Sequence, residues 1–167
     1  MNRTDARNAF SGLENVEIRS STPDWICLNL GPDLALKDRV IGFLRSQMQA
    51  DLPGELPEEL AMAMDELLSN AIEHGCKTEP QCGVELTYIK TPRLILFQTR
   101  DAGPGFSMKR VPHAAVNNPP EDPLRHTRFR LRKGLRPGGF GIMLVRQIAD
   151  ELIYNENGNE VVLIKYL

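Results

Sequence analysis

The chain has 167 residues, of which 41% are hydrophobic and 25% are charged, and these values are ordinary for a globular domain. They exclude a fibrous or largely disordered protein, and a chain of this length most often forms one domain. The formal net charge is only −2, so the whole molecule has little electrostatic attraction for nucleic acid or for an anionic membrane. We therefore predict neither as a direct partner.

The sequence carries no sign of export or of membrane insertion. It lacks the pattern of a secretory signal, and no apolar run approaches the roughly 20 residues that span a bilayer, so we expect a cytoplasmic protein. The three cysteines, Cys27, Cys76 and Cys82, lack the paired spacing of a zinc site. Cys76 and Cys82 are near enough in sequence to meet across a loop. A cytosolic protein normally keeps such residues reduced, so we expect thiols without a functional disulfide.

The N-terminal third predicts a tail, a hairpin and a helix. Residues 1–12 show no periodicity and are expected to form a flexible tail. Alternation of apolar and polar residues over Glu14–Ser20 and Trp25–Leu30 predicts two short strands in an edge hairpin. Asp33 is then a suitable cap for an amphipathic helix that extends to about Ala50.

A second amphipathic helix is predicted to begin at Pro57, which suits a first helical turn, and to end at Gly75. The polar side of this helix, opposite the side predicted to face the core, carries Glu66 and Asn70. These two residues are four positions apart and therefore point the same way. Taken alone, this polar side is most simply exposed to solvent. His74, in the last turn, is expected to cap or pack. The stripe predicted to face the core consists of Leu60, Met64, Leu67, Leu68 and Ala71.

Two further strands, over Gly83–Lys90 and Leu94–Thr99, are predicted to form an antiparallel hairpin. The second strand leads directly into Asp101, and glycines follow at Gly103 and Gly105. In isolation such a stretch is most often a turn.

Residues 107–137 contain five prolines and no sustained hydrophobic pattern. A long stretch of this kind is usually disordered or a functional lid, and we predict a lid. Six Lys or Arg residues lie between Arg125 and Arg136, and two interpretations of them stay open. They form a solvated loop, or some of them close on phosphate groups. Because Phe129 is the only aromatic residue of this run, a platform for single-stranded nucleic acid is disfavoured.

The C-terminal part predicts a helix that is opened by glycines and then a final hairpin. Gly138, Gly139 and Gly141 precede or open an amphipathic segment that extends to residue 152. Asn157 and Gly158 fit a tight turn between two terminal strands. These strands are predicted over Leu152–Asn155 and Glu160–Tyr166.

Together these motifs predict a site for an adenine nucleotide and Mg²⁺. The free N–H groups and the positive end of a glycine-opened helix suit phosphate. The Asn70 carbonyl, phosphate oxygens and waters can complete an Mg²⁺ shell, and Glu66 can act as a general base or orient an attacking hydroxyl. Asp101 can accept a hydrogen bond from an exocyclic amine, while the glycines after it make room for a flat ring.

These residues resemble the motifs of the GHKL ATPase superfamily of gyrase-type ATPases, MutL, heat-shock chaperones and histidine kinases. Glu66–Asn70 matches its N-box, Asp101–Gly105 its first glycine box and Gly139–Gly141 its second. The resemblance implies an α/β (α+β) two-layer sandwich, the Bergerat fold, with helices on one face of a mixed, mainly antiparallel sheet. We therefore predict a single domain over residues 13–167, with an ATP lid at residues 107–137.

The resemblance also implies roles for individual residues. Glu66 would be the catalytic carboxylate, Asn70 would bind Mg²⁺ and Asp101 would bind adenine. The remaining residues implied in nucleotide binding are Gly103 and Gly105 in the first box, and Gly138, Gly139, Phe140 and Gly141 around the second.

Within the superfamily, the chain is most similar to the anti-sigma factor serine/threonine kinases of the RsbW and SpoIIAB type. This similarity implies an ATP-dependent kinase of transcription regulation, which phosphorylates an anti-anti-sigma (STAS-type) antagonist and sequesters a sigma factor. It also leaves a homodimer open. Two alternatives are retained: a nucleotide-dependent binding module without turnover, and a stand-alone histidine kinase catalytic domain whose phosphoacceptor histidine a separate protein supplies.

Overall fold

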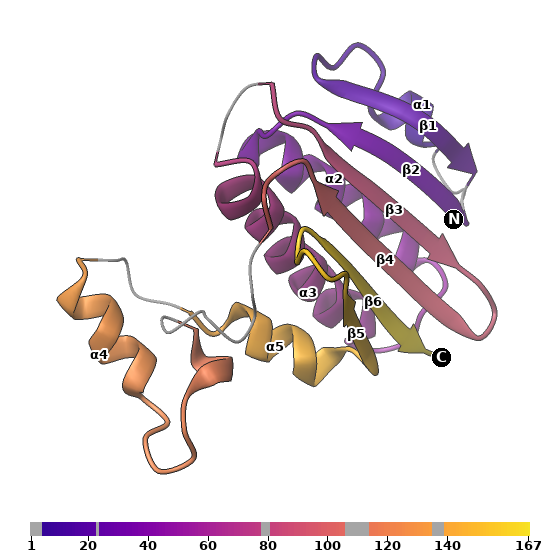
Figure 1. Cartoon of the computed structure of the whole chain (residues 1–167). Coiled ribbons are helices and arrows are strands. Elements are labelled where there is room, and N and C mark those ends of the chain that lie inside the picture. The colour runs from indigo at the N-terminus through magenta and orange to yellow at the C-terminus, as the bar shows by residue number, and fades with distance from the viewer. Residues whose placement is uncertain (1–4, 23, 78–80, 106–113, 135–138) are drawn as a thin grey trace.

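A computed structural model shows an antiparallel sheet with helices packed on one of its faces (Figure 1). It describes residues 5–22, 24–77, 81–105, 114–134 and 139–167. Within these ranges six strands form one sheet in the order β1-β2-β3-β4-β6-β5. Every strand pairing in the described part is antiparallel. The prediction of a mainly antiparallel sheet is therefore confirmed, but the prediction that the sheet is mixed is wrong for these residues. The strands are β1 (Val16–Thr22), β2 (Trp25–Leu30), β3 (Val84–Lys90), β4 (Leu94–Asp101), β5 (Glu151–Tyr154) and β6 (Glu160–Tyr166).

The helix layer is formed mainly by α2 (Leu34–Gln49) and α3 (Leu56–Asn70), which lie side by side against the sheet (Figure 1). The helix α5 (Gly141–Ile148) packs on α3. The predicted two-layer α/β fold is therefore confirmed. As predicted, the Asp33 side chain caps α2, and its Oδ1 accepts from the N–H of Ala35 at 2.8 Å.

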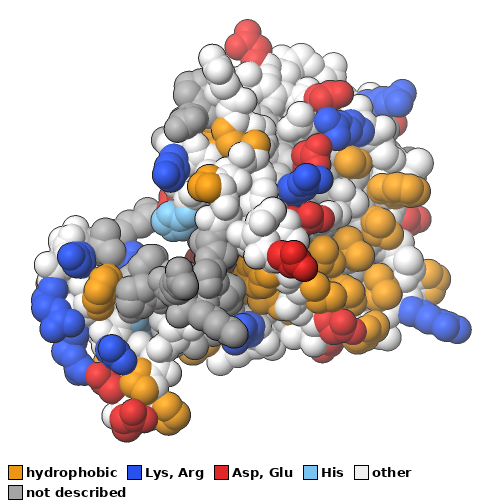
Figure 2. Space-filling view, viewed as in Figure 1, with side chains coloured by type: hydrophobic (Ala, Val, Ile, Leu, Met, Phe, Trp, Pro, Cys, Tyr) orange, Lys and Arg blue, Asp and Glu red, His pale blue; other side chains and the backbone are white. Residues whose placement is uncertain are grey.

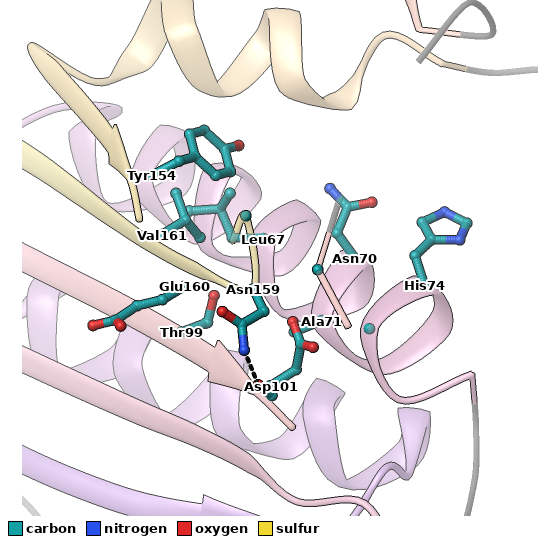
Figure 3. A pocket seen from close by; sticks show the side chains of 13 residues that line it. Leu67, Asn70, Ala71, His74, Thr99, Asp101, Tyr154, Asn159, Glu160 and Val161 are labelled. Atoms are coloured by element: carbon teal, nitrogen blue, oxygen red, sulfur yellow. Dashed lines mark hydrogen bonds between the residues drawn. The ribbon is translucent and has the colours of Figure 1, made fainter. Parts of the chain in front are cut away.

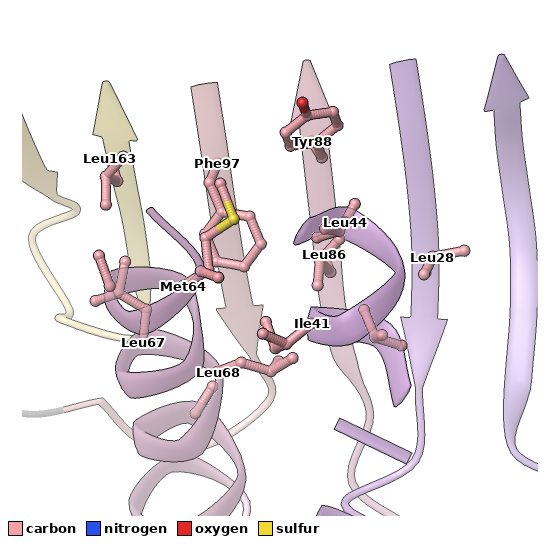
Figure 4. Packing of buried hydrophobic residues seen from close by; sticks show 14 of the residues in the cluster. Leu28, Ile41, Leu44, Met64, Leu67, Leu68, Leu86, Tyr88, Phe97 and Leu163 are labelled. Carbon is pink, nitrogen blue, oxygen red and sulfur yellow. The ribbon is translucent and has the colours of Figure 1, made fainter. Parts of the chain in front are cut away.

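The core lies between this helix layer and the sheet (Figure 4). The predicted stripe of α3 is buried there, since Leu60, Met64 and Leu68 are fully inaccessible to solvent. Burying one such side chain contributes roughly 1.5–3 kcal/mol, and this burial holds the polar side of α3 at the edge of the core. The strands contribute Leu28, Leu86, Tyr88, Phe97 and Leu163.

The N-terminal segment differs from the prediction of a flexible tail over residues 1–12. Residues 1–4 lie outside the described part, but Ala6–Ala9 form a short helix, α1, that the Asp5 side chain caps. Phe10 is only 4% exposed, and its ring meets that of Phe43 on α2 edge-on, with 5.0 Å between centroids. A single buried aromatic ring anchors this segment, and it produces no periodic pattern that the sequence could show.

The predicted lid also contains regular structure. Its described residues form a 3-10 turn, η3 (Ala115–Asn117), and the helix α4 (Arg125–Arg132), which projects away from the sheet (Figure 1). The basic run therefore begins as a helix and not as a loop. His126, which is fully buried, holds this helix in place: its N–H donates to the Asn118 side chain at 2.9 Å, and its ring packs edge-on against Phe140.

The face of the sheet opposite the helices is open and partly apolar (Figure 2). Strand register places Trp25, Ile89, Leu96 and Ile164 in one row across β2, β3, β4 and β6. Trp25 is 56% exposed, and Ile153 on β5 is 50% exposed. Among the described helices, none has the length and apolar character needed to cross a bilayer.

Replacing Phe10 by Ala tests the attachment of α1. We expect a loss of about 3 kcal/mol in the free energy of unfolding, at the lower end for a buried Phe, because the ring leaves a cavity against Phe43. Urea unfolding measures the change, with Met62→Ala on α3, 48% exposed, as the control. Equal, small effects of the two substitutions would mean that the segment is the loose tail that the sequence predicts.

Candidate functional site

A pocket lies where the end of α3, the end of β4 and the β5–β6 turn meet (Figure 3). Three of the predicted site residues, Asn70, Asp101 and Gly105, line it. The structure thus brings the predicted N-box and first glycine box together, although they are far apart in sequence. His74, predicted only to cap or pack, is exposed and lines the same pocket.

The helix side of the pocket ends in an unusual turn. Directly after Asn70, residues Ala71–Gly75 form a π-helical turn, η1, and the N–H of Cys76 donates to the carbonyl of Ala71 at 2.8 Å. Such turns are rare and recur at functional sites, because the extra residue redirects side chains. Here the turn brings His74 and Gly75 to the pocket wall.

Asp101 closes the strand side of the pocket. It is the last residue of β4 and is 8% exposed, and its Oδ1 accepts from the N–H of Gly103 at 2.9 Å. Burial raises the pKa of this carboxyl, while the hydrogen bond from Gly103 opposes the rise. A buried carboxylate with acceptor capacity left over is suited to a ligand that donates a hydrogen bond.

Three glycines allow backbone segments to approach the pocket closely. A Cβ at Gly75 would lie 2.2 Å from Cγ of Asp101, and one at Gly103 would lie 2.1 Å from the carbonyl oxygen of Gly75. Gly105 has a φ of +74°, and a Cβ there would lie 2.0 Å from the carbonyl oxygen of Asn157. Gly75 was predicted as a helix stop, but its immediate role is to leave room for the Asp101 carboxylate.

Glu66 lies one turn before Asn70 and points toward the start of α5. A Cβ at Gly141 would lie 1.9 Å from Oε2 of Glu66, so the carboxylate rests against the backbone of the first residue of that helix. The positive end of a helix stabilises a carboxylate there. The structure therefore brings the N-box and the second glycine box into contact, although Glu66 itself does not line the described pocket.

The rest of the second glycine box joins α5 to the lid. Gly139 has a φ of +92°, and its carbonyl accepts from the N–H of Ala115 at 2.7 Å. Phe140 contacts His126, and burial lowers the pKa of that histidine, with a further lowering from Arg130. Gly138 lies outside the described residues. No described residue of α4 lines the pocket, so the basic helix does not contact this part of the site.

Sequence reasoning missed the contribution of the β5–β6 turn. Asn159 Nδ2 donates to the carbonyl oxygen of Asp101 at 3.0 Å (Figure 3). It also donates to the carbonyl oxygen of Gly103 at 3.4 Å. Asn155 in turn accepts from the N–H of Gly158 at 2.7 Å, which shapes the turn. The sequence contains three closely spaced asparagines here, Asn155, Asn157 and Asn159, but this pattern predicts a turn and not a contact with the first glycine box.

Thr99 and Tyr154 complete the inner wall of the pocket. Thr99 is 2% exposed and lies on the same side of β4 as Asp101. Burial raises the pKa of Tyr154 to about 12, so its hydroxyl keeps its proton at neutral pH. The alternation along these strands predicted which residues face inward, but not that the inner face ends in a pocket.

The donor set around the pocket bears on metal binding. The described residues contain no group of three or more His, Cys, Asp or Glu side chains that could hold a metal ion. The Asn70 amide is one oxygen donor, so an Mg²⁺ ion here would need phosphate oxygens and waters for its remaining ligands. The residues fit a nucleotide-borne ion and not a site built entirely from protein groups.

Comparison with known proteins agrees with this arrangement. The profile of the family described as the histidine kinase-like ATPase domain matches residues 33–165, well over half of the chain. The chain belongs to this family. The match begins at the cap of α2 and ends within β6, so it includes the whole helix layer, the pocket and the lid.

A relative gives a more specific but more distant similarity. This domain is 24% identical over 111 residues to a protein named serine-protein kinase RsbW from Oceanobacillus iheyensis. The alignment covers 66% of this chain and 65% of that relative, so it spans slightly less than two thirds of the relative's length. It supports the resemblance to RsbW-type anti-sigma kinases within the GHKL superfamily.

The substitution Asp101→Asn tests whether burial of the ionised Asp101 carboxylate lowers the free energy of unfolding of the domain. Between the ordinary carboxyl pKa of 3.8 and the raised pKa, the native state binds more protons than the unfolded state. Stability is therefore lost as the pH rises through this window. Asn keeps an acceptor for Gly103 but does not ionise, so without nucleotide the variant should unfold at higher urea than the parent at pH 7. This advantage should shrink below about pH 4, and a difference that is independent of pH would contradict the assignment.

Proposed function

We propose that this domain binds Mg-ATP and transfers its terminal phosphoryl group to a serine or threonine of an anti-anti-sigma protein. The close approach of Gly75 to the Asp101 carboxylate, in a pocket that Asn70 also lines, is the observation that supports nucleotide binding most directly. It presents a buried acceptor and a nearby amide oxygen in a chain of an ATPase family. The distant similarity to an RsbW kinase supports the choice of reaction.

The binding roles follow from the chemistry of each group. Asp101 accepts a hydrogen bond from the exocyclic amine of adenine, and Thr99 and Asn159 flank it. Gly103 and Gly105 allow the first glycine box to pack closely against Gly75 and Asn157, and this packing shapes the pocket wall on which the ring is proposed to lie. Asn70 supplies an oxygen to Mg²⁺, which neutralises phosphate charge. The N–H groups at the start of α5 face the phosphates.

Glu66 is proposed as the catalytic carboxylate. Its position against Gly141 places it at the junction of the N-box and the second glycine box, where the terminal phosphate would lie. From there it accepts the proton of the attacking hydroxyl or orients that hydroxyl for in-line attack. The carboxylate lies against the start of α5, and the positive end of a helix interacts favourably with such a group.

Replacing Glu66 by Gln should lower phosphotransfer to an anti-anti-sigma substrate by roughly 10²- to 10⁴-fold, with ATP affinity retained. Gly141→Ala should act in the same direction, because the new Cβ displaces the Glu66 carboxylate. Glu59→Gln, on an exposed part of α3, is the matched control. Calorimetry with ATP, with and without Mg²⁺, measures binding, and labelled γ-phosphate measures transfer.

The outcomes of this experiment separate the candidate functions. Failure to bind any adenine nucleotide would contradict the proposal as a whole. Tight binding without transfer would favour a nucleotide-dependent binding module, a reading that the absence of Glu66 from the described pocket lining also favours. Transfer to a histidine of a partner protein would favour a stand-alone histidine kinase domain.

The partners are proposed on the same basis. A sigma factor and its antagonist are the partners implied by the resemblance, and a second copy of the chain is proposed to cover the open sheet face. That face carries the apolar row from Trp25 to Ile164, and the low net charge of −2 gives little repulsion between two copies.

Light scattering checks the homodimer. Ile153→Asp on the open face should weaken dimerisation at least about tenfold, since a buried charge replaces roughly 1.5–3 kcal/mol of apolar burial. Leu131→Asp, at a residue of α4 that is 81% exposed and away from the sheet, should leave it unchanged. A parent protein that stays monomeric at millimolar concentration would refute this interface.

A further inference from the structure

The cysteine pair that the sequence assigned to free thiols is joined in the structure. Cys76 and Cys82 form a disulfide with a Cα–Cα distance of 5.4 Å, so the expectation of reduced thiols is corrected. The bond links the residue after the π-helical turn to the residue two positions before β3. Cys76 is 3% exposed, while Cys82 is only partly buried. The third cysteine, Cys27, remains a free thiol.

This disulfide lies directly beside the candidate nucleotide site. Cys76 follows Gly75, whose Cα lies against the Asp101 carboxylate and whose carbonyl lies against Gly103. The N–H of Cys76 also closes the π-helical turn on the carbonyl of Ala71, which itself lines the pocket. A conformational change at Cys76 therefore acts directly on Gly75, the adjacent residue, which lines the pocket beside Asp101.

The other half of the bond is held by the sheet. Cys82 precedes Gly83, where a Cβ would lie 2.8 Å from Oδ1 of Asn29 on β2, so the backbone packs closely there. The disulfide thus ties the pocket end of the helix to the segment directly before β3, an interior strand of the sheet. Without the bond, the π-helical turn loses its covalent link to the sheet beside Asp101.

We infer that Cys76 and Cys82 form a thiol–disulfide modification site that sets the nucleotide affinity of the domain. The disulfide form holds Gly75 against Asp101 and Gly103 and binds nucleotide tightly, whereas the dithiol form releases this turn and binds it weakly. The inference rests on the proposed nucleotide-binding function. In the cytosol, the location predicted from the sequence, a disulfide is usually transient and catalytic or redox-sensing and not structural.

The chemistry requires a dithiol reductant of the thioredoxin class. One of its thiolates attacks Sγ of Cys82, the more accessible sulfur, and the S–S bond breaks with Cys76 leaving as a thiolate that takes up a proton. The second thiol of the reductant then resolves the mixed disulfide. Two electrons and two protons pass to the domain, and the reductant becomes a disulfide. Hydrogen peroxide reverses the change, oxidising both thiols with release of two waters.

Calorimetric titration with ADP tests the inference on the whole chain. The Cys27→Ser variant serves as the parent, because Cys76 and Cys82 are then its only cysteines. After peroxide treatment it should bind ADP about 5- to 150-fold more tightly than after reduction by a dithiol. Adding Cys82→Ser should give the weaker affinity under both conditions. Mass spectrometry after alkylation reports the thiol state of each sample.

The two ways of failing are distinct. Equal ADP affinity of the oxidised and reduced parent, with the change in thiol state verified, would overturn the redox inference and leave the proposed function intact. Absence of ADP binding in both states would overturn both. Because the comparison of oxidised and reduced parent uses one folded protein, it does not depend on whether the Cys82→Ser variant folds.

Discussion

The site depends on the close approach of backbone segments at glycines. At Gly75, Gly103 and Gly141 the space where a side chain would begin is already filled by a carboxylate or a carbonyl. Only with glycine at these positions can the polar end of α3 meet both the end of β4 and the start of α5. The hydrophobic stripe of α3 fixes the helix against the sheet, and the glycines then determine what its polar side touches. Packing and chemistry thus use opposite sides of one helix.

Burial of Asp101 illustrates the cost of preparing such a site. The carboxylate is desolvated before any ligand arrives, and one hydrogen bond from Gly103 compensates only part of that loss. A ligand that donates a hydrogen bond to Asp101 offsets the remaining desolvation free energy. A ligand without such a donor does not, so the buried carboxylate favours ligands that carry one. The same logic explains why an apolar core lies directly behind the pocket, since that core excludes the water that would otherwise solvate the carboxylate.

Much of this fold was predictable from sequence because its elements have strong periodicity. The Asp33 cap, the stripe of α3 and the alternating strands follow local rules, and the order of the three motifs implied the family. Contacts made by single residues were not predictable. Phe10 and His126 each fix a segment through one buried ring, and the Cys76–Cys82 pair depends on where two chain ends meet. Sequence patterns carry no information about contacts of a single buried ring, so the ordered N-terminal segment and the helix α4 were not predicted. For the cysteine pair the spacing allowed a bond, and the expectation of free thiols came from the reducing conditions of the cytosol.

The hydrogen bonds from Asn159 to the first glycine box have a consequence for how the domain is made. Asn159 lies 58 residues beyond Asp101, so during synthesis the segment predicted as a lid and the helix α5 are made before the last hairpin can contact Asp101. Until β6 pairs with β4, the hydrogen bonds from Asn159 to the carbonyl oxygens of Asp101 and Gly103 are missing. The proposed nucleotide site is therefore complete only in molecules whose last hairpin has formed.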